Sequence, residues 1–145
     1  MQFLSAERIL DAGSSGPLWL ADPPIAGIVE NTVRRGAKLG HYILHAYVVM
    51  PNHVHALLEP LVPLAKLMSG IKGVSAREAN AKLCRTGKPF WQDESFDHYV
   101  RNSEEHLKIA EYVEDNPATA GLVSSPELWR WSSVGWAGQG PAPPY

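Results

Sequence analysis

The sequence predicts a single domain that contains both helices and strands, and three observations predict this. The chain has 145 residues, 45% of them hydrophobic, which is enough for one buried core but not for a second full domain. Two segments have the apolar spacing of helices, a third has the spacing of a helix-capping box, and two neighbouring runs have the composition of strands. No internal repeat or linker divides the chain, so we expect one domain over residues 1–145.

The N-terminal residues 1–22 show no convincing period and contain a Gly/Ser/Pro run at 13–17, which predicts an irregular arm. A helix is predicted over residues 24–39, because its apolar residues recur at helical spacing. Asp22 is placed to cap this helix and Gly40 to end it.

A hairpin is predicted next. Residues 42–50 are rich in Tyr, Ile and Val, and a Pro-Asn turn leads into a second β-like run at 53–59. The following segment, 63–83, has a helical period, although Gly70 and Gly73 weaken its middle and could break the helix.

The C-terminal third of the chain predicts an extended segment and one more helix. Residues 90–100 can run extended, and Asn102 and Glu105 then have the spacing of a capping box. Pro117 is expected to end this helix. The Pro/Gly-rich residues 137–145 are expected to form a flexible tail.

Composition limits the classes of protein to consider. A single cysteine, Cys84, excludes an intramolecular disulfide, and no apolar run approaches the roughly 20 residues that span a bilayer, so we expect a cytoplasmic protein. The formal net charge of -2 argues mildly against a protein that grips long tracts of phosphate backbone. Basic residues nevertheless cluster at 34–38 and 66–88, where they form either a nucleic-acid patch or solvated helix faces.

Two pairs of residues have a spacing that suits chemistry. His53 and His55 lie two apart in a predicted strand and therefore share a face, as half of a metal site does, although two surface histidines explain the motif equally well. Tyr112 and Asn116 lie four apart on one helix face, where a nucleophile and an oxygen ligand could act together. Taken singly, a core aromatic and a helix-end residue explain them.

Four strings, in this order, resemble the REP-associated tyrosine transposases, a branch of the HUH single-strand DNA transposases. They are HAYVVMPNHVHALLEP, FWQDESFDHYVRN, EYVEDNPATAGLV and LWRWSS. The resemblance covers residues 5–136. By position, His53 and His55 match the family's metal-ligand histidines, Tyr112 its catalytic tyrosine, and Asn116 the helix residue that completes a site for Mg²⁺ or Mn²⁺.

The resemblance implies the α+β fold class, with a ferredoxin-like antiparallel sheet and helices packed on one side. The histidine strand is expected at its centre, with the tyrosine helix packed across it. Relatives begin with an additional apolar strand, whereas this chain begins MQFLSAERIL, so the family's first strand is predicted to be missing. Such a loss would leave backbone groups of the neighbouring strands unpaired.

The function implied is that of a transposase that cuts and rejoins single-stranded DNA next to hairpins through a 5′-phosphotyrosine link. The protein would act as a monomer or homodimer and would associate with the nucleoid when bound to DNA. Candidate DNA contacts are Arg34, Arg35, Lys72, Arg77 and Arg101. Two alternatives stay open: a hairpin-binding protein that has lost cleavage through the N-terminal truncation, and a metal-dependent hydrolase with a water nucleophile.

Four further residues have two explanations each. His98 and Tyr99 either approach the DNA or belong to a packed strand. Trp129 and Trp131 could stack on bases, but we favour the packing of a C-terminal segment onto the core.

Overall fold

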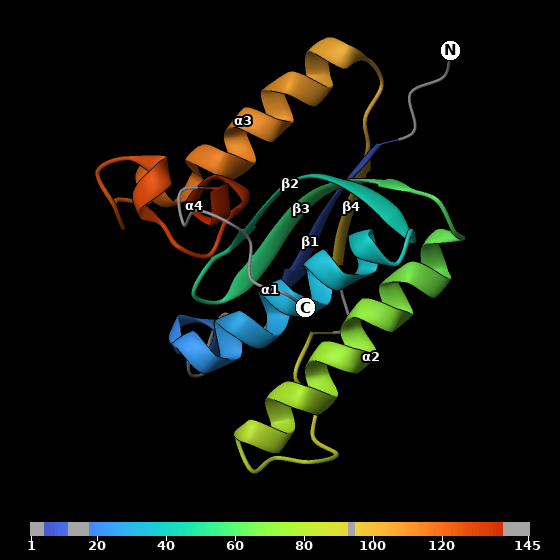
Figure 1. Ribbon diagram of the computed structural model, residues 1–145, viewed down its shortest axis with the longest axis vertical. Helices are drawn as coiled ribbons and strands as arrows, with labels where there is room; N and C mark the ends of the chain where they lie inside the picture. The colour runs from blue at the N-terminus through green and yellow to red at the C-terminus, as the bar shows by residue number, and fades with distance from the viewer. Residues whose placement is uncertain (1–4, 12–17, 93–94, 138–145) are drawn as a thin grey trace.

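The computed structural model describes residues 5–11, 18–92 and 95–137, and the described strands form one antiparallel sheet (Figure 1). Its strand order is β2-β3-β1-β4. The strands are β1 (Ala6–Asp11), β2 (Tyr42–Val49), β3 (His53–Pro60) and β4 (Ser95–Tyr99). β2 and β3 form the predicted hairpin, joined by a tight turn in which the backbone N–H of Met50 donates to the carbonyl of His53.

Strand β1 corrects two of the sequence predictions. It lies between β3 and β4 and pairs antiparallel with both, with Ile9 opposite His55 on one side. The inner position that was predicted to be missing is therefore filled, and residues 6–11 are not an irregular arm. The pattern misled because Glu7 and Arg8 put two adjacent charged residues into this short segment, whereas a strand is usually recognised by apolar residues at alternate positions. Residues 12–17 of the predicted arm lie outside the described residues.

Helices α1 (Pro23–Lys38) and α2 (Leu64–Lys82) lie together on one face of the sheet, as predicted (Figure 1). α1 begins after Asp22, and Gly40 follows its end with a φ of +82°, which glycine adopts without strain. α2 runs without interruption through both of its glycines, so the break that they could cause does not occur. The two helices and the inward residues of β2 and β3 enclose the larger core.

Helix α3 (Ser103–Thr119) packs across the opposite face, over β2 and β3. Val113 is fully buried in a smaller core, where it meets Ala46, Val48 and Leu57. Pro117 lies inside this helix and does not end it, contrary to the prediction. A proline near the end of a helix costs one backbone hydrogen bond, and here the helix continues for two more residues.

The C-terminal segment returns to β2. The indole N–H of Trp129 donates to the carbonyl of Val49, and the N–H of Val49 donates to the carbonyl of Trp131. These contacts agree with the packing role favoured for both tryptophans. The short helices of the described chain are η1 (Trp19–Ala21), η2 (Pro126–Leu128) and α4 (Ser133–Ala137). Beyond Ala137, the predicted tail lies outside the described residues.

None of the helices in the described part of the chain has both the length and the apolar character needed to cross a membrane.

Candidate active site

Two histidines at the start of β3 face the side of the sheet that α3 covers. His53 and His55 are separated by Val54, which points to the other face and is buried in the larger core. His55 is 2% exposed. His53 is half-buried, and its Nδ1 lies 2.9 Å from Oδ1 of Asn52. The predicted pair of histidines therefore lies on one face, close to one end of the strand.

Helix α3 brings Tyr112 to these histidines. The rings of Tyr112 and His55 meet edge to face, with their centroids 5.6 Å apart. The helix is fixed at its start by Asn102, whose Oδ1 accepts a hydrogen bond from the N–H of Glu105, as the capping-box spacing predicts. Tyr112 is 57% exposed, so its hydroxyl is accessible to a bound molecule. Asn116 follows one turn later and is half-buried.

Among the tyrosines that the structure describes, Tyr112 alone is both exposed and beside the histidines. Tyr42 and Tyr47 are buried, and burial raises the pKa of both phenols, which makes them poor nucleophiles. Tyr99 is exposed, but it follows His98 in β4 and therefore points to the other face of the sheet.

A carboxylate that the sequence analysis did not consider touches the site. Oε2 of Glu7 lies 2.5 Å from Nε2 of His55, and the Glu7 side chain is only 13% exposed. Burial lowers the pKa of His55, while the Glu7 charge acts in the opposite direction. The signal in the sequence was weak, because Glu7 lies 48 positions before its partner and in a segment predicted to be irregular.

Two further carboxylate–imidazole pairs connect elements on this face. Nε2 of His98 lies 2.8 Å from Glu105, which also pairs with Arg101. Nε2 of His45 lies 3.5 Å from Glu59. The structure thus gives His98 a contact that attaches β4 to the first turn of α3. This pairing lowers the pKa of Glu105, chiefly through the hydrogen bond with His98.

A known protein family matches the part of the chain that contains these residues. The family model described as "Transposase IS200 like" matches residues 20–116, which include His53, His55, Tyr112 and Asn116. The chain belongs to this family. The match confirms the transposase assignment made from the PNHVH string and from the segment around Tyr112. None of the curated proteins searched matches this chain.

Two solved structures share its fold. A REP-associated tyrosine transposase, solved bound to a REP hairpin, is 17% identical with a TM-score of 0.73, over 99% of this chain and 84% of the other. A putative transposase from Deinococcus radiodurans R1 is 22% identical with a TM-score of 0.53, over 79% of this chain and 91% of the other. Both likenesses concern the fold alone.

The donor atoms of the site suit a small divalent cation. His53 and His55 supply imidazole nitrogens, and the amide oxygen of Asn116 is a hard ligand of the kind that Mg²⁺ and Mn²⁺ accept. In the described parts of the chain, no three His, Cys, Asp or Glu side chains form a ready metal-binding group. The fit therefore rests on the ligand types and on the position of α3, which carries Asn116 and packs over the face of the sheet that both histidines share.

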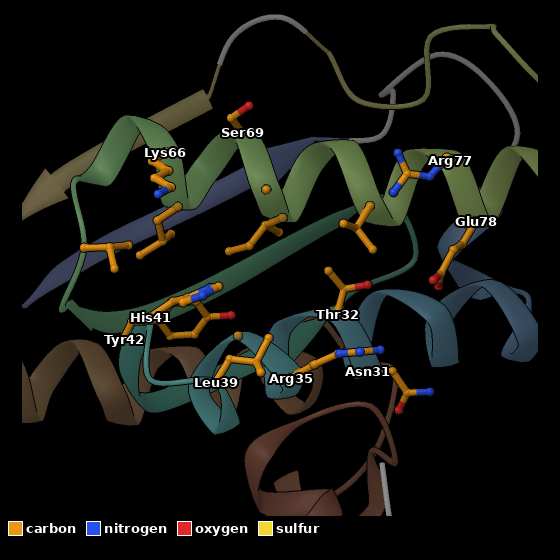
Figure 2. A pocket seen from close by; sticks show the side chains of 16 residues that line it. Asn31, Thr32, Arg35, Leu39, His41, Tyr42, Lys66, Ser69, Arg77 and Glu78 are labelled. Carbon is orange, nitrogen blue, oxygen red and sulfur yellow. The ribbon is translucent and has the colours of Figure 1, made fainter.

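The predicted DNA-binding residues do not gather around Tyr112. Arg35 of α1 and Arg77 of α2 instead line a groove of about 890 Å³ between these two helices, on the other face of the sheet (Figure 2). Lys66 and His41 line the same groove. Its lining also includes apolar residues and one carboxylate, that of Glu78.

The remaining three candidates lie elsewhere. Arg34 is half-buried, and its guanidinium stacks 3.8 Å from the centre of the Trp136 ring, so it helps to hold the C-terminal segment. Lys72 is half-buried on α2. Arg101 is exposed just before α3, on the same side as the catalytic candidates, and pairs with Glu105.

Proposed function

We propose that the transposase cuts and rejoins single-stranded DNA next to REP-like hairpins, with Tyr112 as the nucleophile. The observation that supports this most directly is the contact between the exposed Tyr112 ring and the buried His55. One residue offers an accessible hydroxyl, and the other is a metal-ligand candidate held in place by its surroundings. A nucleophile whose ring contacts a metal-ligand histidine is suited to attack a phosphate that the ion binds.

The reaction proposed is a transesterification. The Tyr112 oxygen attacks phosphorus and forms a new P–O bond while the bond to the 3′ oxygen breaks. The products are a 5′-phosphotyrosine link and a free 3′-hydroxyl, so the reverse reaction rejoins the strand without another energy source. The phenol, whose ordinary pKa is about 10, must lose its proton as it attacks.

His53, His55 and Asn116 are the residues that we assign to the metal ion. When bound, Mg²⁺ or Mn²⁺ would polarise the scissile phosphate as a Lewis acid. The chain's own contribution is to fix one imidazole in a buried position and to carry Asn116 on the same helix as the nucleophile. A rigid strand and a rigid helix then define the distance between metal and hydroxyl.

Basic residues would bind the DNA backbone in two places. We assign Arg101 to the strand entering the site, because it is exposed at the start of the tyrosine helix. Arg35 and Arg77 are assigned to a more distant part of the DNA, because they lie in the groove on the other face. Arg34 and Lys72 are weaker candidates, since both are half-buried.

The experiment that tests the proposal is a covalent-adduct assay. Purified protein is mixed with Mn²⁺ and a 3′-labelled single strand that carries a hairpin from the sequences flanking the gene. The parent should give a labelled band at the mass of protein plus DNA, and Tyr112→Phe should give none. Tyr99→Phe is the matched control, because this exposed tyrosine points to the other face and should retain the adduct.

The remaining outcomes identify the alternatives. Hairpin binding by a folded parent protein without any adduct would support a binding protein that has lost cleavage. The presence of β1 removes the missing strand as the reason for such a loss. Strand cleavage by both the parent and Tyr112→Phe would instead indicate a hydrolase with a water nucleophile.

A further inference from the structure

Glu7 reaches His55 from a neighbouring strand. In the β1–β3 ladder, Glu7 lies opposite Leu57 and Ile9 lies opposite His55, so Glu7 is one same-face position away from the histidine. Its side chain crosses this diagonal, and Oε2 lies 2.5 Å from Nε2 of His55. A carboxylate that is only 13% exposed in the middle of a sheet is costly to bury, so a specific partner is expected.

The two atoms are as close as in a short hydrogen bond, which is closer than two neighbouring ligands of one ion lie. Mg²⁺ binds its ligands at roughly 2.0–2.1 Å in octahedral geometry, which puts neighbouring ligand atoms about 3 Å apart. The donor atoms of Glu7 and His55 are 2.5 Å apart, so a small opening of the pair gives this spacing. The contact involves Nε2, the ring nitrogen farthest from the backbone, and the His55 ring also meets the ring of Tyr112.

Charge also favours Glu7. The predicted ligands His53, His55 and Asn116 have no negative charge when the imidazoles are neutral, whereas hard divalent cations are usually bound with at least one carboxylate. The other carboxylates paired with imidazoles on this face, Glu59 and Glu105, are engaged with different histidines. Glu7 supplies an anionic oxygen in direct contact with a predicted ligand.

We propose that Glu7 is a ligand of the metal ion and shares it with His55. The inference rests on the proposed metal-assisted function and adds a residue from β1 to it. Glu7, His53 and His55 do not form a ready metal-binding group in the described structure, so the ion would have to draw their side chains together. It would then join three elements, β1, β3 and α3, of which two are inner strands of the sheet. A purely positioning role, in which Glu7 only orients the imidazole, makes a different prediction for the water bound to the ion.

The test measures Mn²⁺ binding in the absence of DNA, by electron paramagnetic resonance and by the relaxation of water protons. The parent is compared with Glu7→Gln, Glu7→Ala and the matched control Glu59→Gln, with thermal unfolding to verify that each is folded. Glu59 is suitable because it also pairs with a histidine on the same face of the sheet but does not touch His55. We expect both Glu7 variants to bind Mn²⁺ at least about tenfold more weakly. Glu7→Ala should also give faster water relaxation per bound ion, because water takes the vacated position.

Three results would overturn the inference. Unchanged affinity in both Glu7 variants would exclude Glu7 from the site and leave the rest of the proposed function intact. Weaker binding with unchanged relaxation per ion in Glu7→Ala would show that Glu7 only positions His55. A folded parent that binds no Mn²⁺ would overturn the metal-assisted function itself, and the inference with it.

Discussion

The face of the sheet under α1 and α2 buries a cluster of seventeen described residues, whereas the face under α3 buries a cluster of six. The smaller cluster shares its face with several carboxylate–imidazole pairs and with Tyr112. Because successive side chains of a strand point to opposite faces, β3 contributes to both. Stability is thus concentrated on one side of the sheet and polar chemistry on the other, and this separation can be tested by paired substitutions.

The largest effect is expected from two neighbouring leucines of β3. Leu58 is buried in the larger core and Leu57 in the smaller one, and both are at most 1% exposed. Leu58→Ala should lower the free energy of unfolding by about 3–5 kcal/mol and Leu57→Ala by about 2–3 kcal/mol. The difference is expected because the side chain removed from the larger core loses more packing contacts. Urea denaturation measures both. A larger loss for Leu57→Ala would contradict the division between the faces.

A second pair of substitutions tests how closely α1 and α2 pack against their neighbours on the face with the larger core. A Cβ on Gly36 of α1 would lie 2.7 Å from two ring carbons of Tyr42, which is itself 2% exposed and cannot move away. Gly36→Ala should therefore cost about 1–3 kcal/mol of unfolding free energy. Gly70 of α2 has no atom within 4 Å of such a Cβ, so Gly70→Ala should stabilise by about 0.5–1 kcal/mol. Thermal unfolding of the two variants should shift in opposite directions.

The same separation explains which elements could be predicted from sequence. The hairpin and the helices α1 and α2 show apolar patterns because each presents an apolar side to a core, and their predicted bounds lie close to those found. Helix α3 was predicted from its capping box, and it extends past the predicted end at Pro117. β1 shows no such period, since Glu7 contacts His55 on one face and Arg8 is buried on the other. A strand whose charged residues have partners elsewhere in the fold cannot be recognised from its local apolar pattern.

The site was predictable only in part, for a related reason. Spacing alone put His53 and His55 on one face, and Tyr112 and Asn116 on one helix side. The ring centroids of His55 and Tyr112 lie 5.6 Å apart. This contact depends on how α3 crosses β3, which the local spacing of residues does not determine. The contribution of Glu7 depends on pairing between β1 and β3, whose contacting residues are 48 positions apart.

Substitutions of two asparagines, Asn102 at the start of α3 and Asn116 within it, test stability and adduct formation separately. Asn102 caps α3, so Asn102→Ala should cost about 1 kcal/mol of unfolding free energy but leave adduct formation by the intact fraction unchanged. Asn116→Ala should instead leave stability nearly unchanged and lower the rate of adduct formation by roughly 10–100-fold, as expected for a lost metal contact. The adduct assay and urea unfolding measure the two properties. Equal effects of both variants on the adduct would contradict the role assigned to Asn116.

The smallest expected effect concerns His106, on the same helix. Burial lowers its pKa, nearby His45 lowers it further, and Glu59 acts in the opposite direction. Its imidazole packs against His45, and its Nδ1 lies 3.1 Å from the hydroxyl of Ser5. The folded state therefore binds the proton less readily than the unfolded chain. The resulting stability is present above the ordinary pKa of 6.5 and is lost as pH falls through the lower pKa of the folded state.

Acidification should therefore destabilise the parent more than His106→Gln. The measurement is the difference in unfolding free energy between the two proteins at roughly pH 8 and pH 5. His41→Gln, at an exposed position in the groove on the other face, provides the reference for replacing a histidine. If the parent and His106→Gln lose stability equally on acidification, the imidazole of His106 is not the group responsible for the acid sensitivity.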